Sequence, residues 1–192
     1  SQNISFKSED PILVGAHFDA DDLKAYDYTN FYIDSISFRA GADLTYNVQL
    51  WSGLDGQEVV VWNKDVDVEK GDRWVSVALD SPVKLDPSKS YYIAYEVTPE
   101  SDKYPFGVDD GPLTKGGGMM YGYTYQSNSY TWYSLAYGIN FEISAHLTTV
   151  PDRTKEDHSA VTYQLYRLKS NDNNSEENWT LVTKDALSEQ SY

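Results

Sequence analysis

The stretch from Tyr91 to Val97, with the sequence YYIAYEV, alternates between two kinds of side chain. Large apolar or aromatic residues occupy the odd positions, and Tyr92, Ala94 and Glu96 occupy the even ones. A period of two is typical of a β-strand that buries one face and leaves the other wetter. The same alternation recurs at residues 44–50, 75–79 and 141–147, so the chain is expected to be rich in strands.

Further strand candidates are separated by short clusters of turn-forming residues. The candidates are residues 12–18, 31–39, 58–68, 118–125 and 130–135, and the turn clusters are residues 52–56, 69–72, 81–82 and 86–88. This spacing of about 8–12 residues is the rhythm of a sandwich or barrel. Ala20 to Tyr26 is the one candidate helical turn, with Asp19 as its cap. The sequence therefore predicts an all-β fold, an antiparallel sandwich.

The character of the sequence changes after Leu147. Residues 148–159 are polar and are interpreted as a linker, and residues 161–169 and 179–184 are two further strand candidates. The segment is too short to form a second sandwich of about 90–100 residues. We therefore expect a β-sandwich over residues 1–149, followed by a linker and a short β segment over residues 150–192.

Charge and cysteine content exclude several functional classes. The formal net charge is -15 and the chain has no Cys. The negative charge argues against nucleic acid and against anionic membranes as partners. The missing thiols exclude Cys nucleophiles, Cys-ligated zinc and iron–sulfur clusters. No apolar stretch is long enough to cross a bilayer, so membrane insertion is not expected.

The order of motifs in the first 149 residues resembles a known family of modules. The run comprises Ile36-Ser37-Phe38, YNVQLWSG at 46–53, RWVSVALDSPV at 73–83, YYIAY at 91–95, YPFGVDDGP at 104–112, GGGMM at 116–120, Trp132 and NFEISA at 140–145. Over about residues 4–148 it is similar to the jelly-roll modules of the cleaved-adhesin type from secreted or surface bacterial proteins. The resemblance implies a jelly-roll sandwich, an extracellular or cell-surface location and a module that is not itself catalytic.

The C-terminal segment has a resemblance of its own. YQLYR at 163–167, WTLV at 179–182 and SY at 191–192 look like the middle of a fibronectin type III domain. The early Trp-bearing strand of that domain has no counterpart in this sequence. A partial fibronectin type III-like segment is the resulting expectation.

No catalytic motif is present in the sequence. There is no G-x-S-x-G elbow and no HExxH pattern, and His17, His146 and His158 are widely spaced. His146 alternates with the apolar residues of its strand, so it is expected at the surface. The 30 acidic side chains neither exclude nor nominate the carboxylate pair of a glycoside hydrolase. We therefore expect a protein that is not an enzyme, with a glycoside hydrolase as an alternative.

Two acidic clusters are candidates for a metal site. Asp19, Asp21 and Asp22 follow a predicted strand, and Asp109 and Asp110 lie in a loop. Calcium prefers several carboxylate and carbonyl oxygens on a loop, so a calcium site at Asp19, Asp21 and Asp22 is chemically reasonable. The register does not fit an EF-hand, however, and a helix cap with a solvated turn explains the same residues. We therefore expect no obligatory cofactor, with calcium as the alternative.

Aromatic residues are the compositional excess that bears on function. The chain has 17 Tyr, and Tyr121, Tyr123 and Tyr125 share one face of a predicted strand. Such rings stack on sugars or anchor proteins, although core packing across strands is the alternative. The resemblance places Trp132 in the core. The proposed contacts, on loops at one end of the sandwich, are Tyr104, Asp109, Asp110, Tyr123, Tyr125 and Tyr130.

Together these features predict an adhesion or recognition module. We expect a monomer that binds a glycan or a surface protein. The alternative that is also non-catalytic is a structural accessory domain of a larger secreted enzyme. In such a domain the same aromatic side chains would be buried.

Overall fold

The structure is a computed structural model that describes residues 1–135, 138–149, 166–167 and 180–181. The chain divides into two compact units, Ser1–Pro151 and Asp152–Tyr192. In the second unit, β13 (Tyr166–Arg167) and β14 (Thr180–Leu181) form an antiparallel pair. These strands fall within the two segments in which the sequence predicts strands. The rest of the expected fibronectin type III-like segment lies outside the described residues.

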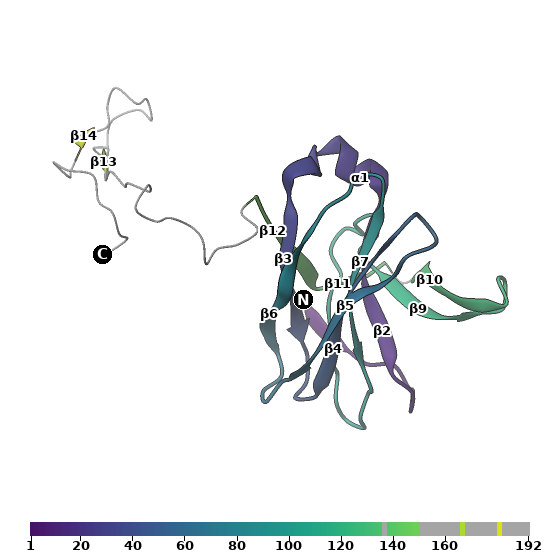
Figure 1. Cartoon of the computed structure of the whole chain (residues 1–192). Coiled ribbons are helices and arrows are strands. Elements are labelled where there is room, and N and C mark those ends of the chain that lie inside the picture. The colour runs from purple at the N-terminus through teal and green to yellow at the C-terminus, as the bar shows by residue number, and fades with distance from the viewer. Residues whose placement is uncertain (136–137, 150–165, 168–179, 182–192) are drawn as a thin grey trace. The chain divides into compact units, whose positions relative to one another are not determined.

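The first unit consists of two antiparallel sheets (Figure 1). Sheet B has the order β10-β9-β2-β7-β4-β5, with bounds Ser129–Ser134, Met119–Thr124, Ile12–Phe18, Ser90–Val97, Thr45–Gly53 and Val59–Asp67. Sheet A contains β1 (Gln2–Ile4), β3 (Tyr32–Ala40), β6 (Arg73–Lys84), β8 (Phe106–Asp109), β11 (Asn140–Phe141) and β12 (Ile143–Thr148). The prediction of an all-β antiparallel sandwich is confirmed, and the jelly-roll detail stays a prediction.

The core lies between the inner faces of the two sheets. In β7, Tyr91, Ile93 and Tyr95 enter this core, as their alternation predicts. The ring of Phe38 from sheet A stacks on Tyr95 with the centroids 4.7 Å apart. Val97 belongs to the same core, whereas Tyr92, Ala94 and Glu96 point to the outer face of sheet B. This one strand therefore contributes side chains both to the core and to the surface described below.

A short helix follows β2 where the sequence predicts a helical turn. Helix α1 (Ala20–Ala25) begins after Asp19, whose side chain accepts a hydrogen bond from the Asp22 amide. The Asp22 side chain in turn accepts one from the Asp19 amide, which completes a capping box. A 3-10 helix, η1 (Tyr28–Asn30), then leads into β3.

One predicted turn is wrong. Ser81-Pro82 was expected to end a strand, but β6 continues through it to Lys84. The pairing of β6 with β3 passes from Ser35↔Ala78 to Ile33↔Val83, so the residues between Ala78 and Val83 form an irregular bulge. Proline is tolerated there because a bulged residue does not need to donate a ladder hydrogen bond.

The Tyr46 hydroxyl is a buried polar group that joins two loops to the core. It donates to the Ala42 carbonyl at 2.9 Å, lies 3.2 Å from the Pro105 carbonyl and accepts from the Ala42 amide at 3.2 Å. Burial raises the pKa of this hydroxyl to about 12. The hydroxyl therefore satisfies the amide and the carbonyl of Ala42, whereas the Pro105 carbonyl also accepts from the Gly41 amide at 3.0 Å.

We expect Tyr46→Phe to lower the free energy of unfolding by about 1–3 kcal/mol, because it leaves buried backbone groups unsatisfied. Urea unfolding followed by fluorescence measures the change. The control is Tyr26→Phe, because the Tyr26 side chain is 70% exposed. A change for Tyr46→Phe no larger than that of the control would contradict this account.

Candidate functional site

The strand register of sheet B aligns side chains in rows across its outer face. Directly paired residues of neighbouring strands point to the same face. One row crosses all six strands, and from β5 to β10 its members are Asp65, Asn47, Glu96, Leu13, Tyr121 and Trp132. The polar members thus lie toward β5 and the aromatic members toward β10.

The centre of the next row is made of small residues. Gly15 of β2 pairs with Ala94 of β7, and Ala94 pairs with Gln49 of β4. A Cβ atom added to Gly15 would lie 2.2 Å from the Ile93 carbonyl oxygen, so only glycine fits this approach of the two strands. The small pair leaves room above the sheet for the large rings on either side of it.

Those rings form a connected aromatic cluster. Trp132 stacks on Tyr92 with the centroids 4.3 Å apart and an interplanar angle of 9°. Trp51 meets the edge of Trp132 at 5.5 Å and lies 5.1 Å from Tyr121. We call Trp51, Tyr92, Tyr121 and Trp132 the aromatic cluster. Aromatic pairs in such offset and edge arrangements fix each other's orientation.

The expectation that Trp132 is a core residue is wrong. Its ring is half-buried on the outer face of sheet B, and it is absent from the core between the sheets. The even-numbered residues of β10 point outward, whereas Tyr133 packs against the core. The indole Nε1 of Trp132 is buried and has no hydrogen-bond partner in the described part of the chain.

Exposed tyrosines extend the cluster along the β9–β10 hairpin, which projects beyond the neighbouring strands (Figure 1). Tyr121 stacks on Tyr130 at 6.2 Å, Tyr130 meets Tyr123 at 5.7 Å, and Tyr123 meets Tyr125 at 5.5 Å. The exposed fractions of Tyr123, Tyr125 and Tyr130 are 45%, 92% and 68%. These three predicted contact residues therefore lie together, and we call them the hairpin tyrosines.

A chain of hydrogen bonds runs beside the aromatic cluster. Trp51 Nε1 donates to Gln49 Oε1 at 2.8 Å, and Gln49 Nε2 donates to Asn47 Oδ1 at 2.7 Å. Asn47 Nδ2 then donates to Asp65 Oδ1 at 2.7 Å. Each amide is oriented by its neighbour, so the outer face presents polar groups in a fixed arrangement. We call Gln49, Asn47 and Asp65 the polar chain.

Glu96 lies next to Asn47 on the same face. Burial of the Glu96 carboxyl, with a smaller contribution from the negative charge of Asp65, raises its pKa above the ordinary value. The face therefore combines two carboxyl groups with amides and aromatic rings. These are the groups that bind neutral polar ligands.

The other predicted contact residues lie elsewhere. Tyr104 is 58% exposed and lines two hollows of about 790 and 390 Å³, which the preceding loop forms with residues 5–9 and with residues 41–43, respectively. Asp109 accepts a hydrogen bond from the Gly111 amide at 3.0 Å, which is a turn contact, and Asp110 is exposed. None of the ring contacts between described residues joins Tyr104 to the hairpin tyrosines. The sequence pattern could not separate these groups because it carries no information on which loops meet.

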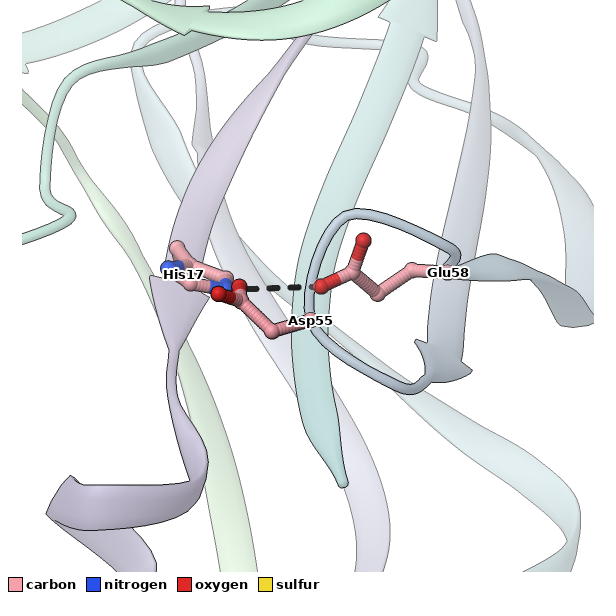
Figure 2. Close-up of side chains that lie close together, drawn as sticks. All are labelled: His17, Asp55 and Glu58. Atoms are coloured by element: carbon pink, nitrogen blue, oxygen red, sulfur yellow. Dashed lines mark ion pairs between the residues drawn. The ribbon is translucent and has the colours of Figure 1, made fainter. Parts of the chain in front are cut away.

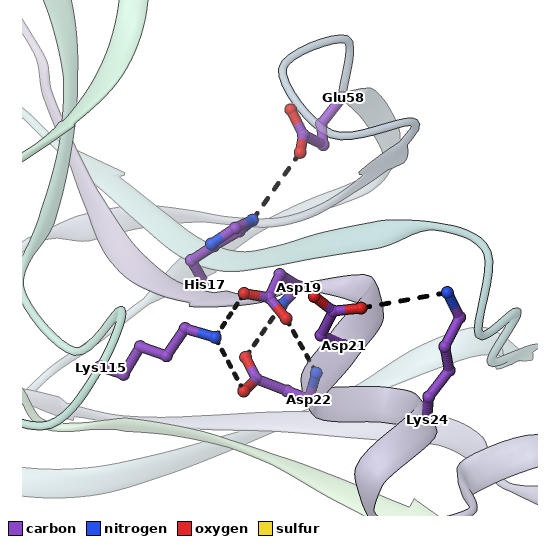
Figure 3. A network of polar contacts seen from close by, with 7 residues as sticks. All are labelled: His17, Asp19, Asp21, Asp22, Lys24, Glu58 and Lys115. Carbon is purple, nitrogen blue, oxygen red and sulfur yellow. Dashed lines mark hydrogen bonds and ion pairs between the residues drawn. The ribbon is translucent and has the colours of Figure 1, made fainter.

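The predicted calcium ligands already have a cationic partner (Figure 3). The Lys115 ammonium lies between Asp19 and Asp22, 3.0 Å from Asp22 Oδ1 and in close contact with Asp19. The hydrogen bond that Lys115 donates to Asp19, together with that from the Asp22 amide, lowers the pKa of Asp19 to about 2. Asp21 points outward with 93% of its side chain exposed, near Lys24. The geometry thus favours the helix cap over calcium.

Sequence reasoning missed a second cluster of possible metal ligands. His17 of β2 meets Asp55 and Glu58 from the loop between β4 and β5 (Figure 2). One ligand atom from each residue lies within 4.8 Å of the others. No sequence motif of fixed spacing indicates this cluster, because His17 is far in sequence from the loop that supplies the carboxylates.

The prediction that His146 lies at the surface is confirmed. Its side chain is 53% exposed, and its Nδ1 lies 2.7 Å from Asp34 Oδ1. This pair contains one carboxylate, in contrast to the two carboxylates near His17.

Comparisons with protein-family models, curated proteins and solved structures found no match. No helix in the described part of the chain is long and apolar enough to cross a membrane. The chemistry of the outer face therefore has to be argued from its own geometry.

We expect Asp19→Ala to lower the free energy of unfolding at pH 7 by about 1 kcal/mol, because it removes the helix cap. The folded pKa of Asp19 is depressed from 3.8 to about 2. Its contribution to stability is therefore fully present above pH 3.8 and is lost as the pH falls toward 2. Urea unfolding of both proteins at several pH values should show their difference shrinking over that range.

The matched control for this experiment is Asp21→Ala, whose stability should stay within about 0.5 kcal/mol of the unmodified protein. Adding calcium should leave the melting midpoints of all three proteins unchanged. Stabilisation by calcium that disappears in Asp19→Ala would restore the metal interpretation.

Proposed function

We propose that this protein is a non-catalytic recognition module that binds an uncharged glycan on the outer face of sheet B and along the β9–β10 hairpin. The observation that carries the proposal is the continuity of the hairpin tyrosines with the aromatic cluster, beside the polar chain. Large exposed aromatic patches on soluble proteins are typical of binding surfaces.

The chemistry of the face suits a sugar. Sugar rings present C–H faces that stack on aromatic rings, and their equatorial hydroxyls need donors and acceptors at the ring edge. Tyr121 and Tyr130 provide the stacking surface, and Asn47, Asp65 and Glu96 provide the polar edge. A sugar crossing the sheet along the row would meet both.

The charge of the protein favours an uncharged ligand. The net charge is -15, and both Asp65 and Glu96 lie on the proposed face. A sialylated or sulfated glycan would be repelled by this field, whereas a neutral one would not.

Exposure of the hairpin tyrosines weighs against an accessory domain that binds nothing. A purely structural domain gains stability by burying such rings, yet Tyr125 is 92% exposed. The resemblance of about residues 4–148 to cleaved-adhesin modules supports an extracellular or cell-surface location. A monomer is sufficient for recognition, because it presents one such face. The alternative partner is a surface protein, which would bind the same face.

We expect Tyr130→Ala and Tyr123→Ala each to weaken glycan binding about tenfold, the loss of one stacking contact of roughly 1–1.5 kcal/mol. A glycan array with neutral and sialylated members identifies the ligand, and titration calorimetry measures the affinity. The melting midpoints should stay close to that of the unmodified protein, because both side chains are exposed.

Tyr104→Ala and Tyr26→Ala are the matched controls, since both remove an exposed tyrosine outside the proposed face. Both should retain full affinity. If no neutral glycan binds, or if the controls lose as much affinity as the hairpin variants, the proposal is wrong. Binding of a protein partner that requires Tyr130 would instead assign the same face to protein recognition.

A second candidate function is glycoside hydrolysis, and the raised pKa of Glu96 favours it. Asp65 and Glu96 lie on strands separated by β4, and two strand spacings amount to about 9.6 Å. Inverting hydrolases hold an acid and a base about 6.5–9.5 Å apart. None of the hollows described above contains either residue, so the non-catalytic proposal stands first.

We expect the protein to release no reducing sugar from neutral polysaccharides, and Glu96→Gln to behave identically in a reducing-end assay. The control variant is Asp67→Asn, an exposed acid on the same strand as Asp65. Release of sugar by the unmodified protein and by Asp67→Asn, but not by Glu96→Gln, would establish the hydrolase instead.

A further inference from the structure

We propose that His17, Asp55 and Glu58 form a binding site for a divalent transition-metal ion, and that Zn²⁺ is the ion this ligand set suits best. The proposal concerns a different part of the molecule from the polar chain and does not depend on glycan binding.

The fold brings the three residues together on the outer face of sheet B, near the end of β2 and beside the loop that joins β4 to β5. His17 pairs with Tyr92, which pairs with Trp51, so its imidazole continues the row of the aromatic cluster. The connection from β4 to β5 turns back tightly, with the Gln57 amide donating to the Leu54 carbonyl at 2.8 Å. That turn carries the two carboxylates toward the imidazole (Figure 2).

Glycines make this tight turn possible. Gly56 has a φ of +78°, which favours glycine. A Cβ atom on Gly53 would lie 2.5 Å from the Gln57 carbonyl oxygen. The Gly56 amide donates to Glu58 Oε1 at 3.2 Å and so holds the carboxylate in place.

The distances fit a metal site that needs a small contraction. The three ligand atoms lie within 4.8 Å of one another, and His17 Nε2 is 3.7 Å from Glu58 Oε1. Ligand atoms around a tetrahedral zinc ion lie about 3.4 Å apart, given bonds of about 2.0–2.1 Å. Asp55 belongs to an exposed turn, so its side chain can make most of the adjustment.

The strongest indication of a metal site is that the His17 imidazole and the Glu58 carboxylate face each other with no hydrogen bond between them. His17 Nε2 is buried and has no hydrogen-bond partner among the described residues. The Glu58 side chain is only 3% exposed. A distance of 3.7 Å is too long for a hydrogen bond, and a buried carboxylate is costly unless a cation compensates it. A metal ion would satisfy both groups at once.

The imidazole is held in the orientation that a ligand needs. Its ring stacks on Tyr92 with the centroids 4.3 Å apart, and the His17 amide donates to the Gly116 carbonyl at 2.9 Å. Such supporting contacts orient metal-bound histidines in general.

The chemistry of the ligands selects the ion. Imidazole nitrogens and carboxylate oxygens both serve as zinc ligands in proteins, and imidazole favours transition metals over Ca²⁺ and Mg²⁺. Three protein ligands leave a fourth position for water on the exposed Asp55 side. The competing explanation is a direct ion pair between His17 and Glu58 in the absence of metal.

The test uses the full chain without an affinity tag, after treatment with a chelator. Titration calorimetry with ZnCl₂ should give one site per chain, and CaCl₂ should give no heat. The chain has three His, so imidazole nitrogen NMR can follow each one. Zinc should shift the ring signals of His17 and leave those of His146 and His158 unchanged.

Asp55→Asn and Glu58→Gln should each weaken zinc binding about tenfold or more. At a zinc concentration close to the dissociation constant of the unmodified protein, zinc should raise the melting midpoint of that protein and raise those of the two variants much less. Asp34→Asn is the matched control, because it removes the carboxylate beside His146, and it should bind zinc as the unmodified protein does. Circular dichroism checks that each variant folds, and Asp55→Asn on its exposed turn carries the test if Glu58→Gln does not fold.

Three results would overturn the proposal. The first is an absence of zinc binding, which would leave a direct His17–Glu58 pair as the explanation. The second is zinc binding that survives both Asp55→Asn and Glu58→Gln. The third is a zinc response at His146 or His158 without one at His17.

Discussion

The two faces of β7 are the constraint on which the rest of the structure depends. This strand lies inside sheet B, between β2 and β4. Because successive side chains of a strand point to opposite faces, Tyr91, Ile93 and Tyr95 enter the core while Tyr92, Ala94 and Glu96 cannot. A slip of one residue would exchange the two sets and destroy the core. The stability of the sandwich therefore dictates which residues the outer face presents.

The outer face of sheet B has a polar region and an aromatic region. The two regions differ because the strands beside β7 add different side chains to Tyr92, Ala94 and Glu96. Toward β5 lie the polar chain and the Glu96 carboxyl, whereas the aromatic cluster extends from Trp51 on β4 to Trp132 on β10, where the hairpin tyrosines continue it. At the centre of the face, the small residues Ala94 and Gly15 do not protrude from the sheet. Tyr92 connects the face to the candidate metal site, since its ring contacts both His17 and Trp132. A metal ion there would help to fix one end of the aromatic stack.

Several features of the fold could be predicted because they are local. The bounds of β2 and the helix cap at Asp19 follow from periodicity and from turn chemistry, which involve residues close together in the sequence. Pro82 was misjudged because its tolerance depends on a bulge against β3, a contact that is not local. Trp132 was misjudged because a strand pattern shows that two faces exist but does not show which one meets the other sheet.

By itself the sequence determined that the chain forms antiparallel strands with alternating faces, that its acidic residues include a helix cap, and that tyrosines share one side of a predicted strand. Only the tertiary structure decided that Tyr123, Tyr125 and Tyr130 gather on one hairpin while Tyr104 lies apart, and that Lys115 faces Asp19 and Asp22. It alone brought His17 to Asp55 and Glu58. The physical reason is that periodicity and capping act over a few residues, whereas these clusters depend on the register between strands and on where the loops fold back.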